Sequence, residues 1–187
     1  MNKLERAQSI VGTSKGRPAD EFYPTPEYAT QALLDKEKFP ENIWEPACGD
    51  GAISKVLINN GYSVESTDLY NHGYGKPDND FLKQRYIWID YAIITNPPFK
   101  LASEFLRHAY YDLEDCVKIS LFCKLAFLEG ITRSKLLEET HLTRVWVFRK
   151  RVTLYREGIT MKNSGMIAFC WCVWEKGYDG QPILGWI

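Results

Sequence analysis

The sequence lacks a dominant charge. Its 187 residues carry 23 lysines and arginines against 24 aspartates and glutamates, for a formal net charge of −1 at pH 7. This balance excludes nucleic-acid binding through overall basic charge and leaves only a local basic patch for that purpose. No stretch approaches the ~18 consecutive apolar residues of a membrane span, and the N-terminal stretch lacks the apolar core of a signal peptide. We therefore expect a soluble cytoplasmic protein with no membrane partner.

The sequence also lacks the cysteine spacing of a metal site or a disulfide framework. It has five cysteines, an odd number, with no CxxC pair and no histidine ligands close by: Cys48, Cys116, Cys123, Cys170 and Cys172. This pattern predicts buried, reduced thiols and no metal.

The length suits one domain with a single core. Residues 1–21 are polar and contain glycine, proline and four cations, so we expect a flexible N-terminal arm. Residues 22–187 are expected to form the one folded domain.

The most informative stretch is YAIITNPPFK, residues 91–100. Ala92 to Thr95 is a short apolar, β-branched run, which is typical of a buried parallel strand, and the prolines end it. Asn96 therefore follows the carboxyl end of a strand, where open α/β sheets bind ligands. The Asn96 amide and the Pro97 carbonyl can together accept both hydrogens of an amino group, and Phe99 can stack on a planar base. Taken alone, the stretch also fits an ordinary Asn-Pro turn.

A second motif, EPACGDGAIS, follows a predicted strand at Asn42–Glu45. Its glycines allow a tight turn before a helix that Gly61 ends. The turn is neither GxGxxG nor a phosphate-binding loop, because it lacks the Lys-Ser/Thr pair and is acidic. Glu45 and Asp50 instead suit a ligand with a cationic end.

Acidic residues also follow later elements. A strand over residues 62–67 ends at Asp68, where a carboxylate can accept hydrogen bonds from ribose hydroxyls. Asp80 and Phe81 offer an acceptor beside a ring, which suits adenine. Upstream, Thr25 is predicted to cap a helix whose first residue is Pro26. Whether Tyr23 and Thr25 also reach a ligand is left open by the pattern.

The remaining chain alternates between stretches with the hydrophobic periodicity of helices and stretches with that of strands. We predict a helix that starts near Leu101 and strands over residues 116–122 and 144–148, with a helix over residues 131–140 between them. Residues 166–174 read as an apolar closing strand, joined to its neighbour through residues 158–165. The alternation predicts a mostly parallel sheet covered on both faces.

The order FYPTPE, EPACGDG, Asp68, Asp80-Phe81 and NPPF resembles the S-adenosylmethionine-dependent DNA N6-adenine (amino) methyltransferases, in particular the small phage-type enzymes. The resemblance covers residues 22–100 and is looser beyond them. It implies a Rossmann-like class I methyltransferase fold, with a mostly parallel seven-stranded sheet, an antiparallel closing strand and helices on both faces.

The resemblance also implies site residues. Those implied to bind S-adenosylmethionine are Tyr23, Thr25, Glu45, Ala47, Gly49, Asp50, Asp68, Leu69, Asp80, Phe81 and Asn96. Tyr23 and Thr25 would border its methionine part, and Glu45 would hold its ammonium group. The residues implied to act on the target base are Asn96, Pro97, Pro98 and Phe99.

These residues predict direct methyl transfer to an exocyclic amino group in DNA, most directly adenine N6, after base flipping. No strong base is needed, because the nitrogen becomes acidic once it carries a positive charge. His72, His108 and His141 lie in no motif and are assigned to surface or packing roles. There is no room for a separate target-recognition domain, so sequence specificity should be low.

A local basic patch is the best candidate for contact with nucleic acid. It combines cations and rings: Arg144, Arg149, Lys150, Arg151 and Arg156, with Trp146, Phe148 and Tyr155, after Arg133 and Lys135. Arg149, Lys150, Arg151 and Tyr155 are its central members. A charged strand edge that prevents aggregation explains the patch equally well.

Four other functions fit parts of the pattern. An RNA adenine or guanine methyltransferase also uses NPPF, although DNA is the favoured partner. A catalytically silent cofactor-binding subunit is opposed by the intact Asn96 and Phe99. A protein-glutamine methyltransferase would carry an added helical domain, and a nicotinamide dehydrogenase would carry GxGxxG. The target base, the recognition sequence and the oligomeric state leave no mark on the sequence.

Overall fold

The computed structural model describes residues 22–85, 88–154 and 167–187. Its centre is a seven-stranded sheet in the order β2-β1-β3-β4-β6-β5-β7. The strands are β1 (Asn42–Glu45), β2 (Ser63–Ser66), β3 (Tyr91–Thr95), β4 (Cys116–Lys124), β5 (Arg144–Val147), β6 (Phe169–Glu175) and β7 (Ile183–Trp186). Strand β6 runs antiparallel to both neighbours, and the other pairs are parallel.

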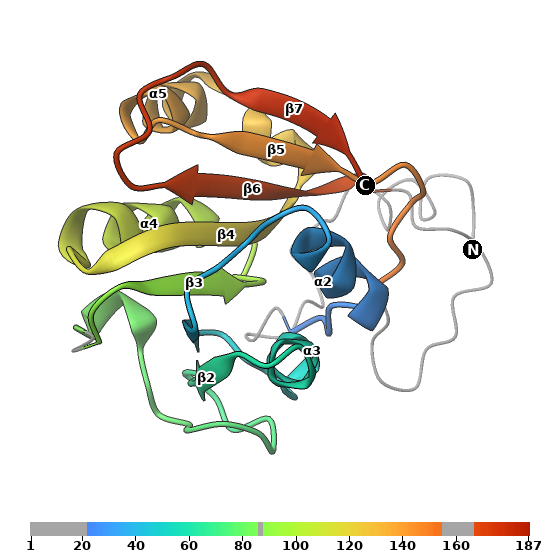
Figure 1. The fold of residues 1–187 in the computed structure, drawn as a ribbon, viewed down its shortest axis with the longest axis vertical. Helices are drawn as coiled ribbons and strands as arrows, with labels where there is room; N and C mark the ends of the chain where they lie inside the picture. The colour runs from blue at the N-terminus through green and yellow to red at the C-terminus, as the bar shows by residue number, and fades with distance from the viewer. Residues whose placement is uncertain (1–21, 86–87, 155–166) are drawn as a thin grey trace, which may run out of the picture.

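Helices cover both faces of the sheet (Figure 1). The α-helices are α2 (Glu27–Leu34), α3 (Ala52–Asn59), α4 (Ala102–Arg107) and α5 (Ile131–Glu139). Leu57 of α3 shares one apolar cluster with Ile94 of β3, whereas Leu106 of α4 shares the other with Ile93. Adjacent strand residues point to opposite faces, so β3 is buried on both. Short 3-10 turns span Phe81–Lys83 and Leu125–Leu128, and a π-helical turn spans His108–Asp112.

The predicted fold class is confirmed, with one difference in strand placement. The antiparallel strand was expected to close the sheet, but β6 lies inside it, between β4 and β5. The edge is formed by β7, which the sequence did not predict. The proposed connection over residues 158–165 and the N-terminal arm lie outside the described residues.

The first three strands bring the acidic and amide motifs to one edge. Strand β1 pairs in parallel with β2 on one side and with β3 on the other, so their carboxyl ends lie together. Glu45 ends β1, Asp68 follows β2, and Asn96 directly follows β3. This arrangement places the predicted site at the usual ligand-binding edge of an open α/β sheet.

All five cysteines are buried free thiols, as predicted. Across the described parts of the chain, no helix combines the length and apolarity needed to cross a membrane.

Candidate active site

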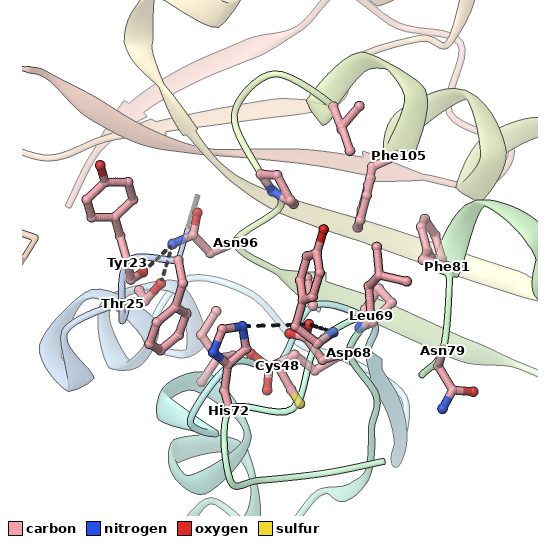
Figure 2. Close-up of a pocket in the computed structure, with 18 of the residues that line it drawn as sticks. Tyr23, Thr25, Cys48, Asp68, Leu69, His72, Asn79, Phe81, Asn96 and Phe105 are labelled. Carbon is pink, nitrogen blue, oxygen red and sulfur yellow. Dashed lines mark hydrogen bonds and ion pairs between the residues drawn. The ribbon is translucent and has the colours of Figure 1, made fainter. Parts of the chain in front are cut away.

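A cavity of about 290 Å³ opens at the carboxyl ends of β1, β2 and β3 (Figure 2). Eleven predicted site residues line it: Tyr23, Thr25, Glu45, Ala47, Asp50, Asp68, Leu69, Asp80, Phe81, Asn96 and Pro98. Gly49, Pro97 and Phe99 are not among its lining residues. The fold therefore brings most of the predicted set to one place, while the role of each residue stays a prediction.

The glycine turn is packed tightly against aromatic rings of the same chain. Gly49 and Gly51 have φ values of +55° and +79°, which side chains rarely adopt. A Cβ at Gly49 would lie 2.1 Å from the ring of Phe22, and one at Gly51 would lie 2.5 Å from the ring of Tyr74. Phe22 also stacks on His72 with 4.3 Å between ring centroids. The space that the absent side chains of these glycines leave is thus filled by aromatic rings of the protein itself.

Asp68 holds the turn in place. Its Oδ2 accepts a hydrogen bond from the Gly49 N–H at 2.8 Å, and its Oδ1 accepts one from the Tyr70 N–H at 2.8 Å. His72 Nε2 lies 4.0 Å from Oδ1. Each carboxylate oxygen has two lone pairs, so Asp68 can support the turn and still accept a further hydrogen bond from a ligand.

Glu45 is a buried carboxyl group that lines the cavity next to the glycine turn. Its side chain is only 2% exposed, and the hydroxyl of Ser54, which also contacts the Ser66 hydroxyl at 2.6 Å, donates a hydrogen bond to it. Burial raises the pKa of Glu45 well above its ordinary value; the Ser54 hydrogen bond opposes this rise, and the charges of Asp50 and Asp68 add to it. A cationic group in the cavity would relieve this crowding of negative charge.

The side-chain amide of Asn96 is hydrogen-bonded to two residues of the segment that precedes α2. Its Nδ2 donates to the main-chain carbonyl of Tyr23 and to Oγ1 of Thr25, each at 3.0 Å (Figure 2). The predicted capping role of Thr25 is wrong: α2 begins at Glu27 after an N-cap Pro26, without a side-chain cap hydrogen bond. The Thr25 hydroxyl accepts from Asn96 instead.

Asp80 and Phe81 are already engaged by their neighbours. The Asp80 carboxylate accepts from the Leu82 N–H at 3.2 Å and pairs with Lys83 Nζ at 2.7 Å. The Phe81 ring is 2% exposed and belongs to the core, with its centroid 4.6 Å from that of Phe105. Any stacking of a ligand on Phe81 is limited to the part of the ring that lines the cavity.

Phe99 is half-buried beside the cavity rather than within its lining. Its ring lies 6.3 Å from the ring of Tyr23 at an interplanar angle of 20°, and 5.8 Å from the ring of Phe169. The ammonium of Lys124 lies 4.4 Å from its centroid. The surroundings of Phe99 are thus aromatic and cationic, which suits a planar base.

Sequence reasoning missed His72 and Phe22 as cavity residues. His72 does pack, because it stacks on Phe22, and it also lines the cavity next to Asp68. The signal was weak, since His72 lies in a glycine-rich loop without a motif. His108 does pack in the core, where its ring meets Phe81 edge-on with 4.9 Å between centroids.

The described residues include only part of the predicted basic patch. Arg149, Lys150 and Arg151 are exposed directly after β5, and Tyr155 and Arg156 lie outside the described residues. Arg144 instead forms ion pairs with Glu37 and Glu175.

The other predicted members of the patch are also used internally. Trp146 donates to Glu37 at 2.7 Å, and Phe148 packs against the core. Arg133 donates to the main-chain carbonyls of residues 126 and 127, and Lys135 lies 3.8 Å from Glu139. Half of the cations and rings of the predicted patch therefore have partners within the fold, and contact of the patch with nucleic acid stays a prediction.

No group of three or more His, Cys, Asp or Glu side chains in the described ranges is arranged to hold a metal ion.

The sequence matches no family model and no curated protein. Its fold does match solved structures. One is a modification subunit of a putative type I restriction enzyme from Vibrio vulnificus (14% identity, TM-score 0.60), with 98% of this chain and 50% of that chain covered. A putative RNA methyltransferase from Pyrococcus horikoshii gives 16% identity, TM-score 0.60 and coverages of 94% and 99%. A putative class I S-adenosylmethionine-dependent methyltransferase from Listeria monocytogenes gives 14% identity and a TM-score of 0.61, with 98% of this chain and 71% of that chain covered.

The chain spans half the length of the type I modification subunit that it matches. At identities of 14 to 16%, the likeness concerns the arrangement of strands and helices. That arrangement is the Rossmann-like α/β fold of the class I S-adenosylmethionine-dependent methyltransferases.

Proposed function

We propose that this protein is an S-adenosylmethionine-dependent methyltransferase that modifies an exocyclic amino group of a base in DNA, most directly adenine N6. The observation that carries the proposal is the position of the Asn96 amide. It follows the carboxyl end of β3, its nitrogen is fixed by two hydrogen bonds, and it lines a cavity that also contains acidic side chains. The type I modification subunit among the structural matches supports DNA as the substrate.

The cavity residues fit the cofactor. Glu45 is crowded by the charges of Asp50 and Asp68, and an ammonium group would stabilise its ionised form. Asp68 keeps lone pairs for ribose hydroxyls, and Leu69 and Phe81 provide apolar walls for a purine. When bound, S-adenosylmethionine supplies an electrophilic methyl group on a sulfonium.

The chain's own contribution to the reaction is to hold and align the nucleophile. An aromatic amino group is a poor nucleophile because its lone pair is delocalised into the ring. Asn96 Oδ1 and the Pro97 carbonyl would accept its two hydrogens and leave the lone pair free along the transfer direction. That pair would form the new N–CH3 bond while the S–CH3 bond breaks with its electrons left on sulfur, and one nitrogen proton would then leave to water.

A base can reach this site only outside a duplex stack. The target nucleotide would therefore be flipped out, with Phe99 as a stacking partner. Arg149, Lys150 and Arg151 would contact phosphates of the same strand, because they follow β5 at the edge where β3 delivers Asn96.

A second candidate is methylation of an amino group in RNA. The putative RNA methyltransferase from Pyrococcus horikoshii is covered over 99% of its length, whereas the type I subunit is covered over half. An RNA substrate can be recognised largely by its shape, with few base-specific contacts.

The test is incubation with radiolabelled S-adenosylmethionine and, in parallel, unmethylated duplex DNA, single-stranded DNA and total RNA, followed by nucleoside analysis. The expected result is N6-methyladenine from DNA with the wild type and no label with Asn96→Ala, which should still bind S-adenosylhomocysteine. Label in RNA alone selects the second candidate. Cofactor binding without transfer to any substrate indicates a silent binding subunit, and an active Asn96→Ala protein contradicts the assigned chemistry.

A further inference from the structure

We propose that Thr25 is a positioning residue for the transfer step. Together with the main-chain carbonyl of Tyr23, its hydroxyl fixes the Asn96 amide so that the amide oxygen is presented to the amino group of the target base. This inference rests on the proposed function and gives Thr25 a different role from the cofactor contact expected from the sequence.

The contacts determine which way the amide faces. The Tyr23 carbonyl oxygen can only accept a hydrogen bond, so the Asn96 atom that lies 3.0 Å from it must be the nitrogen. The Thr25 hydroxyl accepts the second amide hydrogen, also at 3.0 Å. A flipped amide would set its oxygen against the Tyr23 carbonyl, which is repulsive. Figure 2 shows both contacts at the nitrogen end of the amide, with the oxygen directed away from them.

The burial of Thr25 makes this contact hard to replace. Its side chain is 3% exposed, so water has little access to take over the hydrogen bond to Asn96. The hydroxyl makes no capping bond to α2, and its acceptor capacity is therefore left for the amide. Donation through the nitrogen also polarises the amide and makes its oxygen a stronger acceptor.

The geometry favours alignment over binding as the function of the contact. Thr25 touches the nitrogen of Asn96, on the side away from the oxygen that would meet the base. Loss of the contact would let the amide rotate about its side-chain torsions, while a side chain of equal volume at Thr25 keeps the shape of the cavity wall. Such misalignment lowers the rate of transfer more than it lowers the affinity for either substrate.

Two substitutions at one position test this. Thr25→Val keeps the volume and removes the acceptor, whereas Thr25→Ser keeps the hydroxyl. We expect Thr25→Val to lower kcat by about tenfold to hundredfold, with little change in KM for the nucleic acid or in Kd for S-adenosylhomocysteine. Thr25→Ser should restore kcat to near the wild-type value. Thermal melting of each variant separates this effect from a loss of folded protein.

A second readout does not depend on activity. In the ¹⁵N-labelled wild type, the Asn96 side-chain amide should give two resolved, slowly exchanging proton signals, assigned by their loss in Asn96→Ala. In Thr25→Val one of the two should shift and exchange faster, and in Thr25→Ser both should stay close to the wild type.

Each possible outcome either supports or overturns the positioning role of Thr25. Unchanged amide signals in Thr25→Val, or unchanged kcat, overturns the proposal. A fall in kcat matched by an equal fall in cofactor affinity identifies Thr25 as a cofactor contact instead. A wild type that methylates no nucleic acid refutes the proposed function, and the amide signals then still show whether Thr25 fixes Asn96.

Discussion

Ser54, in the first turn of α3, donates a hydrogen bond to the buried carboxylate of Glu45. The bond stabilises the ionised form of Glu45, while burial and the nearby charges of Asp50 and Asp68 oppose ionisation. Burial has the larger effect, so the pKa of Glu45 stays well above its ordinary value. A carboxyl group with a raised pKa releases its proton when a cationic group binds beside it.

We expect the affinity for S-adenosylhomocysteine to rise with pH up to the raised pKa of Glu45. Below that pKa the free protein holds Glu45 protonated, so binding of the ligand's ammonium group must release a proton; above it, none is released. Calorimetric titration in buffers of different ionisation enthalpy measures the proton release. Glu45→Gln should bind more weakly and without this pH dependence. Equal pH dependence in wild type and variant would show that Glu45 does not meet the ammonium.

The same raised pKa predicts a stability cost at neutral pH. The folded protein binds the Glu45 proton more tightly than the unfolded chain, so this contribution to stability is full below the ordinary carboxyl pKa of about 4.3 and falls as pH rises toward the raised value. Glu45→Gln lacks this loss, so its free energy of unfolding should change less than that of the wild type between acidic and neutral pH. Urea unfolding from acidic to neutral pH measures the difference.

Ser54→Ala provides the matched control for that experiment. It removes the hydrogen bond that lowers the pKa of Glu45, so the loss of stability with rising pH should extend to higher pH than in the wild type. A wild type whose stability is flat over this range contradicts the raised pKa.

Much of the site could be predicted because its signals are local. A buried strand followed at once by Asn96-Pro97, or by the glycine turn after Glu45, marks a strand end from a few adjacent residues. What failed depends on contacts across the sequence. Thr25 reads as a helix cap until Asn96, 71 residues away, is placed against it. Arg144 reads as a free cation until Glu37, 107 residues away, is paired with it.

Strand β7 shows a second limit of local patterns. It spans four residues and contains Gly185, which weakens the strand signal. The structure explains the glycine, because a Cβ there would lie 2.3 Å from the ring of Trp146 on the adjacent β5. The residue that hides the strand in the sequence is the one that lets the two strands pack.

The packing of Phe22 on the glycine turn predicts the effect of one methyl group. Gly49→Ala introduces a Cβ against the Phe22 ring at a positive φ, and should cost about 2 to 4 kcal/mol of unfolding free energy. Gly61→Ala is the control, because its φ is +89° but nothing lies within 4 Å of a Cβ there. It should cost only the backbone strain, about 1 kcal/mol.

The clash and the strain at Gly49 can be separated by a second change. In Phe22→Ala the ring is absent, so adding Gly49→Ala should then cost no more than Gly61→Ala does in the wild type. Urea unfolding of the four proteins in this cycle gives the coupling. An additive cycle would show that the ring does not press on the turn.

Arg149 and Arg151 predict the salt dependence of nucleic-acid binding. Both are exposed after β5, and the main-chain N–H of Arg149, which donates to the Ile187 carbonyl at 2.8 Å, is kept on substitution. If each contacts a phosphate, Arg149→Glu/Arg151→Glu should weaken duplex binding and reduce the slope of log K against log salt by about 2. Lys38→Glu/Lys176→Glu makes the same charge change at the opposite edge of the sheet, because Lys38 precedes β1 and Lys176 follows the antiparallel β6. That control should leave the slope unchanged, because counterion release depends on the phosphates contacted rather than on net charge. Equal effects of the two double variants would assign Arg149 and Arg151 to solubility and place the nucleic-acid surface elsewhere.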